Sequence, residues 1–361
     1  MADPKPGSIY LPPEGPELKL RRGESLAEAA RRVLRRQFER MTWNESCTRA
    51  GADPECLHQM RVATRRLRAA LSVFHEALGV RRARRLRADL RRFGTALGAV
   101  RDLDVQIARL DAGPRRGTIR IDEALGLYRA FLQARREKAR LALLHGLSGE
   151  RYRGFVHTFR GVLEERGGTR AGREDAGAAG ARIVRKRLRK ALRGGRRLTA
   201  LSGDAGLHAE RIRLKRLRYA CEFFADLLGP EATRFAARVT ELQDALGEQH
   251  DAVVGRETLS DVARRLDAPP ALRRQTILMF ARRMSEDVHR ERTARREFFR
   301  LWQRFDRGKT RRALKAAMGR AEKSGKDGAE GGSRTLTPGK GNRFLKPARL
   351  PVPPLRRRRK S

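Results

Sequence analysis

Two segments of the sequence place a histidine and a row of basic residues on consecutive turns of a helix. The first segment is LHQMRVATRRLR, beginning at Leu57, and the second is LHAERIRLKRLR, beginning at Leu207. At about 100° per residue, the histidine and the basic residues that follow it at intervals of three or four positions share one face of each helix. The residues on this face are His58, Arg61, Arg65 and Arg68 in the first segment, and His208, Arg211, Lys215 and Arg218 in the second. The pattern predicts two matching cationic helix faces.

The chemistry that such a face favours is the binding of an extended anion. Like charges on neighbouring helical turns repel one another by roughly 0.2–0.5 kcal/mol per pair, and no carboxylate lies between Arg61 and Ala70 to relieve them. Arginine suits phosphate because its planar guanidinium donates two parallel hydrogen bonds and stays charged. A row of charges that only faces solvent is the alternative interpretation. Because the row recurs and lacks counter-charges, we predict an anion-binding site.

The histidines and a second pair of motifs add to this pattern. His58 and His208 stand near the starts of their helices, where each either bonds to local backbone or donates to a bound phosphate. Further along, the motifs LGAVRD and LGEQHD place Arg101-Asp102 and His250-Asp251 in matching positions. We expect both aspartates to orient neighbouring arginines. The sequence contains no nucleophile–base pair, phosphate loop or His/Cys metal motif, so we predict no catalytic residue, no metal and no cofactor.

The charge balance is strongly basic. The 361 residues carry 84 Lys and Arg against 42 Asp and Glu, a formal net charge of +42. Residues 320–361 hold 13 of the basic residues and 3 of the acidic ones, so most of the excess belongs to the rest of the chain. Such a surface attracts polyanions, which include nucleic acid, anionic membranes and polyphosphate. Ala, Leu and Arg outnumber β-branched and aromatic residues, which favours helices over strands.

The cysteines and the N-terminus indicate the compartment. Cys47, Cys56 and Cys221 are odd in number and have no CxxC spacing, so we expect small reduced core residues rather than a disulfide framework. The first 20 residues contain acidic residues and prolines without the apolar run of a signal peptide. No apolar stretch is long enough to span a bilayer. These features predict a cytoplasmic protein without a membrane partner.

Helical periodicity, interrupted by Pro- and Gly-rich stretches, divides the chain. Apolar residues recur at helical spacing and never in a sustained strand-like alternation, so we predict an all-α fold without a sheet. Capping patterns mark helix starts at Ser25 and at Asp53-Pro54. The predicted parts are 1–23 as a disordered segment, 24–166 as the first helical half, 167–180 as a Gly-rich linker, 181–319 as the second helical half, and 320–361 as a disordered basic tail.

At the two repeated segments and at the motifs RDLDV (101–105) and LQDALG (242–247), the sequence resembles the CHAD family, the conserved-histidine α-helical domain. The resemblance covers about residues 24–310. It implies an internal duplication of two four-helix bundles around a basic central cavity, without catalytic activity. It also implies binding of long-chain inorganic polyphosphate and, for some members, association with polyphosphate granules. Because only 23 residues precede the matching region, we expect a stand-alone member without the triphosphate-tunnel domain of many relatives.

Carried over by position, the resemblance implies one set of polyphosphate contacts. These are His58, Arg61, Arg65, Arg66, Arg68 and Arg101 in the first half, and His208, Arg211, Lys215, Arg216, Arg218 and Tyr219 in the second. His250 stands where the first half has Arg101, so we expect the halves to contribute unequally. The alternative function is binding of RNA or DNA. Against it, the basic faces lack interleaved aromatics that stack on bases and Asn or Gln that read base edges.

Overall fold

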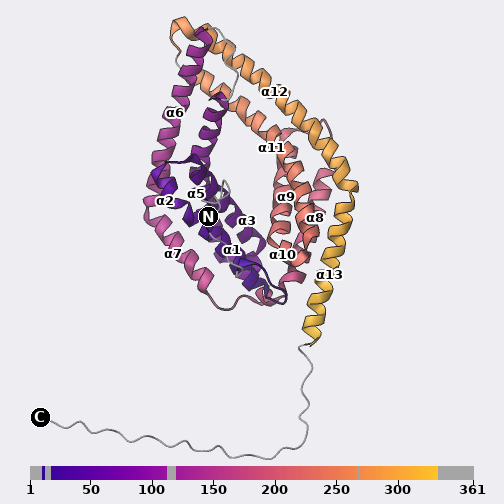
Figure 1. Cartoon of the computed structure of the whole chain (residues 1–361). Helices are drawn as coiled ribbons and strands as arrows, with labels where there is room; N and C mark the ends of the chain where they lie inside the picture. The colour runs from indigo at the N-terminus through magenta and orange to yellow at the C-terminus, as the bar shows by residue number, and fades with distance from the viewer. Residues whose placement is uncertain (1–9, 13–17, 112–118, 267, 332–361) are drawn as a thin grey trace, which may run out of the picture.

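The computed structural model describes residues 10–12, 18–111, 119–266 and 268–331 (Figure 1). Within these residues the chain forms helices joined by short connections, without a strand, and the predicted all-α fold is confirmed. Two backbone segments meet in one isolated bridge between Ser25 and Asp175. No helix in the described part of the chain is long and apolar enough to cross a membrane.

The helices follow one another in two runs. The first run consists of α1 (Leu26–Trp43), α2 (Glu45–Ala50), α3 (Pro54–Val73), α4 (His75–Leu78), α5 (Val80–Asp111), α6 (Ile119–Ser148) and α7 (Glu150–Glu164). A short 3-10 helix, Arg170–Arg173, follows. The second run consists of α8 (Ala176–Gly195), α9 (Asp204–Phe223), α10 (Ala225–Leu228), α11 (Pro230–Arg265), α12 (Pro270–Arg307) and α13 (Lys309–Gly331).

Two pairs of helices, one from each run, have equal lengths, and the runs exchange one reciprocal contact. α3 and α9 each contain 20 residues, and α4 and α10 each contain 4. At the start of α1, the Leu26 N–H donates to the Glu174 carbonyl at 2.8 Å. At the start of α8, the Ala176 N–H donates to the Glu24 carbonyl at 2.9 Å. This exchange ties the start of the first run to the start of the second.

One apolar core extends through both runs. The inward residues predicted for the repeated segments are buried, and they include Met60, Ala63, Leu67, Ala70, Leu71, Leu217, Ala220 and Cys221. At the ends of α3 and α9, Phe74 and Phe224 pack with their ring centroids 5.3 Å apart. Because these two rings belong to opposite runs, the runs share a core and hold α3 and α9 close together.

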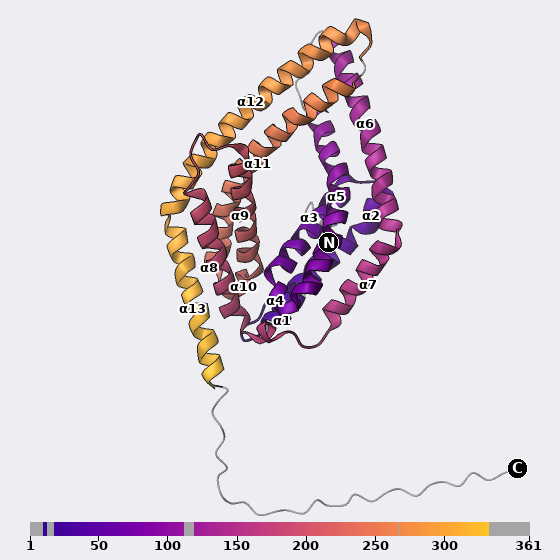
Figure 2. The same cartoon turned by 180° about the vertical axis from the view of Figure 1, so that it is seen from behind.

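A second, smaller apolar cluster lies at the far end of the molecule. α5 and α6 lead away from α3, α11 and α12 lead away from α9, and the two pairs meet again at their tips (Figures 1 and 2). There Tyr128 of α6 and Phe280 of α12 meet edge to face, with centroids 5.2 Å apart. Leu259 and Val262 of α11 are buried in the same cluster. The helices thus trace a closed frame, with α3 and α9 at one end.

The predicted helix starts are confirmed by their caps. The Glu28 N–H donates to the Ser25 hydroxyl at 3.3 Å, and the Ser25 N–H donates to the Glu28 carboxylate at 2.9 Å. At α3, the Asp53 carboxylate accepts from the Glu55 N–H at 2.8 Å, and Pro54 takes the first helical position. Both caps thus fix where the helices begin.

Three predicted boundaries differ from the structure. Leu18 and Leu20 are buried, and the Leu20 N–H donates to Asp226 at 3.0 Å, so part of the predicted N-terminal disordered segment packs on the fold. α8 begins at Ala176, inside the predicted linker, because the Asp175 side chain caps it. α13 continues past residue 320, where the disordered tail was predicted to begin. Residues 1–9, 13–17 and 332–361 lie outside the described part of the chain.

α13 forms because it has a buried face and ion pairs of its own. Its buried residues are Leu314, Ala317 and Met318. Beyond them, Arg320 donates to Glu231 of α11 at 2.7 Å, and Glu322 pairs with Arg185 of α8. The Gly- and Lys-rich composition after residue 320 concealed this helix.

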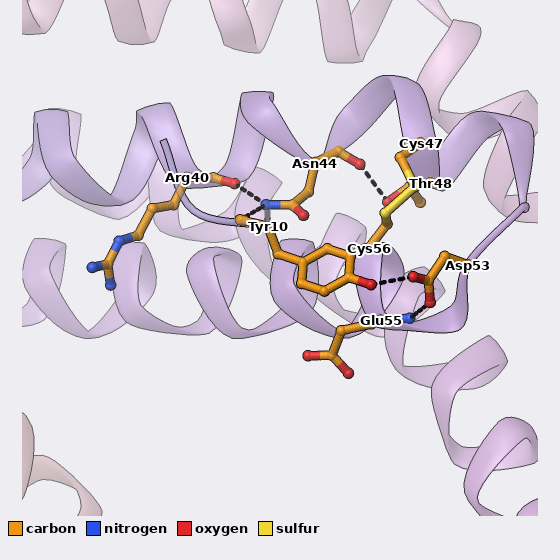
Figure 3. The surroundings of a disulfide bond; sticks show 8 residues. All are labelled: Tyr10, Arg40, Asn44, Cys47, Thr48, Asp53, Glu55 and Cys56. Atoms are coloured by element: carbon orange, nitrogen blue, oxygen red, sulfur yellow. Dashed lines mark hydrogen bonds between the residues drawn. A yellow bond between two sulfur atoms is a disulfide. The ribbon is translucent and has the colours of Figure 1, made fainter. Parts of the chain in front are cut away.

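The structure also contradicts the expectation of three reduced cysteines. Cys47 of α2 and Cys56 of α3 form a disulfide (Figure 3). The turn between the helices is the cause. Gly51 ends α2 in the left-handed conformation, with φ of 71°, and α3 begins at Pro54, so the two Cα atoms lie 5.9 Å apart. Cys221 is buried and free, as expected.

Candidate anion-binding site

The two cationic faces meet where α3 and α9 lie next to one another. Both helices bury their apolar faces in the shared core, and this draws the adjoining basic residues together. Lys215 of α9 lies in the electrostatic field of four arginines from both helices. They are Arg61 and Arg65 of α3, and Arg211 and Arg218 of α9. We call Lys215 and these four arginines the central cluster. Five of the predicted contacts, drawn from both halves, are thus brought together.

The closeness of these charges changes their ionisation. Burial, reinforced by the neighbouring arginines, lowers the pKa of Lys215 to about 7. Burial likewise lowers the pKa of the Arg65 guanidinium, and Arg61 and Arg218 add to the effect. The charges that affect the pKa of Lys215 most are all cations, although Arg61 and Arg218 at the margins of the cluster contact Asp102 and Glu222. The central cluster therefore repels itself when empty, and a bound anion would relieve that repulsion.

Several polar atoms in and beside the central cluster are buried without a hydrogen-bond partner in the described structure. They are Nε of Arg65, Nε of Arg218, the hydroxyl of Tyr219 and Nδ1 of His58. Leaving such a group unsatisfied costs about 1–3 kcal/mol. Proteins seldom leave several of these groups close together, and a ligand rich in oxygen atoms would supply the missing partners.

The two predicted histidines lie at the edge of the central cluster, each beside the long helix that follows. Burial lowers the pKa of His58, and Arg101 of α5 is the charge that contributes most. In the second half, the ring centroids of His208 and His250 lie 4.8 Å apart. Burial, with Arg211 next, lowers the pKa of His250. The matching pairs are therefore His58 with Arg101 and His208 with His250, so the halves differ by one permanent charge.

Arg66 holds the two halves to one another. It pairs with Glu222 of α9 at 2.5 Å, and its Nε donates to Gln37 of α1 at 3.1 Å. Its guanidinium lies 5.6 Å from the centroid of the Tyr219 ring, which is 2% exposed. Arg218 pairs with the same Glu222 at 3.3 Å. These contacts occupy Arg66 within the protein and distinguish it from its neighbour Arg65.

Arg68 and Arg216 lie apart from the central cluster. Nη1 of Arg68 lies over α5, 3.8 Å from where a Cβ on Gly94 would stand. Arg216 is exposed on α9, and its carbonyl accepts a hydrogen bond from Arg187 of α8 at 2.6 Å. The predicted contacts therefore divide into a central group and a group directed toward α5 and α8.

The two aspartates contact arginines, as expected. Asp102 lies 3.4 Å from Arg61, and Asp251 lies 3.9 Å from Arg109. Burial raises the pKa of Asp102, and Arg61 partly offsets this. Because Arg109 belongs to α5 and Asp251 to α11, the second pair also links the two sides of the frame.

Two hollows in the described structure lie away from the predicted contacts. One, of about 760 Å³, lies between α11 and α12 and is lined by charged residues that include Asp244, Glu248 and Arg290. The other, of about 660 Å³, lies between α5 and α7 and includes Arg81 and Arg85. Neither is lined by a residue of the predicted contact set, so neither is the predicted basic central cavity.

The sequence did not reveal the roles of Glu222 and Arg187. Glu222 joins Arg66 and Arg218, and Arg187 donates to the carbonyls of Arg216 and Ser72 at 2.6 and 3.2 Å. In the first half, Ser72 stands at the position that matches Glu222, and Gln37 stands at the position that matches Arg187. Comparison of the two halves therefore could not reveal either residue.

The fold and the site together define an all-helical protein in which two runs of helices gather cationic side chains between them. The chain matches the CHAD domain family over residues 32–260, and it belongs to that family.

Two proteins of Mycobacterium tuberculosis are related to the chain along its sequence. They are the uncharacterized proteins MT2285, of strain CDC 1551 / Oshkosh, and Rv2226, of strain ATCC 25618 / H37Rv. Each is 30% identical over 243 residues, which is 64% of this chain and 45% of the relative. The match thus spans about half the length of these relatives.

Two solved structures share the fold. The CHAD domain from the plant Ricinus communis is 28% identical, with a TM-score of 0.61 over 79% of this chain and 96% of its own. PptA from Streptomyces chartreusis is 20% identical, with a TM-score of 0.63 over 78% of this chain and 100% of its own. The arrangement of the helices is therefore common to these proteins.

Proposed function

We propose that this chain binds long-chain inorganic polyphosphate at the central cluster and does not turn it over. The observation that carries the proposal is the convergence of Arg61, Arg65 and Lys215 from two halves of the chain, beside buried polar atoms that have no protein partner. The link of the CHAD family with polyphosphate supports it. Association with polyphosphate granules belongs to the same proposal.

The extent of the cluster favours a linear anion over a single phosphate. Arg61 and Arg65 lie one helical turn apart, which is about 6 Å along α3. Arg211 and Lys215 repeat that spacing on α9. An anion with a charge at each repeat unit reaches all four side chains, whereas one phosphate group reaches a part of them. Arginine is the residue best suited to chelate successive phosphate groups.

Nucleic acid is the alternative anion, and the surroundings of the cluster argue against it. The aromatic ring beside the central cluster is that of Tyr219, and it is 2% exposed. The guanidinium groups of Arg66 and Arg218 lie over this ring, 5.6 and 5.0 Å from its centroid. It therefore cannot stack on a base, which is the main sequence-tolerant contact in single-strand binding.

A competition titration tests the proposed ligand. A labelled long-chain polyphosphate is bound to the full chain at near-physiological salt, and unlabelled polyphosphate or RNA of matched total charge is added. We expect polyphosphate to displace the label at much lower concentration than RNA does. Equal displacement by the two would indicate a general polyanion surface, and no binding of the label would refute the proposal.

The absence of turnover needs a separate assay. The chain is incubated with long-chain polyphosphate and Mg²⁺, and free phosphate and chain length are followed. We expect neither release of phosphate nor shortening of the chain. Phosphate release that disappears in a variant of the central cluster would show that the site is catalytic.

A further inference from the structure

A second group of arginines adjoins the central cluster on the side of the first half. We call it the flanking cluster: Arg68 of α3, Arg87 and Arg91 of α5, Arg187 of α8 and Arg216 of α9. Burial lowers the pKa of Arg68, and Arg91 and Arg87 are the charges that add to it. Burial lowers the pKa of Arg187 to about 10, and Arg216 and Arg87 are the cations that add to it. Arg87 therefore lies close enough to Arg68 and Arg187 to join all five in one group.

A path along α3 and α5 connects the two clusters. Nε of Arg61 lies 3.7 Å from where a Cβ on Gly98 would stand, and Nη1 of Arg68 lies 3.8 Å from the same point on Gly94. These glycines are one turn apart on α5, or about 6 Å. An anion that contacts Arg61 beside Gly98 therefore reaches Arg68 beside Gly94, one turn away along α5.

The part of the flanking cluster that α5 supplies has no counterpart in the second half. At the positions that match Arg87 and Arg91, counted back from the Leu-Gly motif, α11 carries Ala236 and Thr240. Arg218, which matches Arg68, pairs with Glu222 at 3.3 Å and lies in the field of Asp244. In the second half, the last cation of the row, Arg218, therefore lies beside the carboxylates of Glu222 and Asp244.

We infer that a bound polyphosphate chain leaves the central cluster in one direction, along α3 and α5 over the flanking cluster. This rests on the proposed function and adds a second subsite, in which residues of α5 and α8 outside the repeated motif join Arg68 and Arg216. A polyphosphate of only a few phosphate units binds at the central cluster and does not reach the flanking cluster. A long chain occupies both clusters, so the flanking cluster selects for length.

Two double variants of α5 test the inference. R87Q/R91Q removes two charges of the flanking cluster, and R81Q/R85Q removes two exposed charges at the same spacing that line the hollow between α5 and α7. The full-length parent and both variants are titrated with sodium tripolyphosphate and with long-chain polyphosphate at one moderate salt concentration. Thermal melts accompany the titrations, since all four arginines are exposed and replacing them should leave the fold intact.

We expect R87Q/R91Q to weaken binding of the long chain by about tenfold, as the loss of two phosphate contacts predicts, and to leave tripolyphosphate within about twofold. R81Q/R85Q should leave both ligands within about twofold. An equal loss in the two variants, an equal loss for the two ligands, or no loss in R87Q/R91Q would overturn the inference. In those cases a parent that still binds both ligands leaves the proposed function intact. A parent that binds neither ligand refutes both.

Discussion

Arg65 and Lys215 occupy the same position in the two repeated segments and lie close to one another between α3 and α9. Their like charges meet because α3 and α9 share one core, in which Phe74 and Phe224 pack against each other. Repulsion between partly buried cations is a cost that folding alone does not explain. A polyanion that bridges the halves would turn this cost into a binding determinant.

Replacing Arg66 by Gln should destabilise the fold, in contrast to replacing its neighbour Arg65. The change removes the ion pair with Glu222 and leaves that partly buried carboxylate with Arg218 alone. We expect the free energy of unfolding to fall by about 2 kcal/mol in R66Q. R65Q, which removes no carboxylate contact, is the matched control and should not lose stability. Denaturant unfolding of the two variants measures this, and equal stability of both would contradict the role assigned to Arg66.

Polyphosphate affinity should fall as the pH rises above 7. Burial and the four arginines around it lower the pKa of Lys215 to about 7, so in the free protein this amine is largely neutral at higher pH. Bound polyphosphate favours the charged form of Lys215, so above pH 7 this amine takes up a proton when polyphosphate binds. The affinity should decline by up to about tenfold per pH unit above pH 7.

The variant K215R separates this effect from other titrations. Arginine keeps its charge across the same pH range. The affinity of K215R for polyphosphate should therefore be much less dependent on pH than that of the parent. The stability of the free parent should rise between pH 7 and 10.5, because the unfolded chain binds this proton and the folded one does not. Titrations in buffers of different ionisation enthalpy report proton uptake directly. Equal proton uptake by K215R and the parent would exclude Lys215 as the source.

Reduction of the disulfide should destabilise the protein. The bond between Cys47 and Cys56 closes a loop of separation 9, and its loss should cost about 2–3 kcal/mol. Denaturant midpoints of the parent are compared with and without a reducing agent, with C47S/C56S as the control that cannot respond. A parent whose midpoint ignores the reductant would show that these cysteines are not bonded in solution.

Shortening the chain within α13 should cost stability but not the site. A chain that ends at Gly319 loses the pair of Arg320 with Glu231 and that of Arg185 with Glu322, whereas one that ends at Gly331 keeps both. Because solvent screens these partly exposed pairs, the chain that ends at Gly319 should melt at only a slightly lower temperature. Thermal melts of the two truncated chains compare them. Equal melting temperatures would mean that the end of α13 adds nothing to stability.

The buried and cationic faces of α3 and α9 could be predicted because apolar residues at helical spacing become the buried face. Met60, Leu67 and Leu217 recur at helical spacing and are buried, and the basic residues beside them fall on the adjoining face. That Arg65 and Lys215 lie near one another could not be predicted from the periodicity of either helix alone. Periodicity describes one helix at a time and does not state which helix lies opposite.

Features that depend on long-range packing could not be read from the sequence. Arg65 and Arg66 are adjacent and chemically identical, yet only Arg66 meets Glu222, because that carboxylate arrives from α9. The flanking cluster draws on α5 and α8, whose many arginines show no distinctive spacing. The disulfide depends on a turn at Gly51 that reverses the chain between two helices.

The most direct test of polyphosphate binding at the central cluster is the salt dependence of affinity in the variant R61Q/R65Q/K215Q. This variant removes three charges from the central cluster and keeps side chains that favour helix. We expect it to be at least as stable as the parent and to bind long-chain polyphosphate more than tenfold more weakly. By analogy with single strands, its plot of log affinity against log salt should be shallower by about 2, at roughly 0.7 per lost contact. A folded variant with the affinity and slope of the parent would show that polyphosphate binds elsewhere.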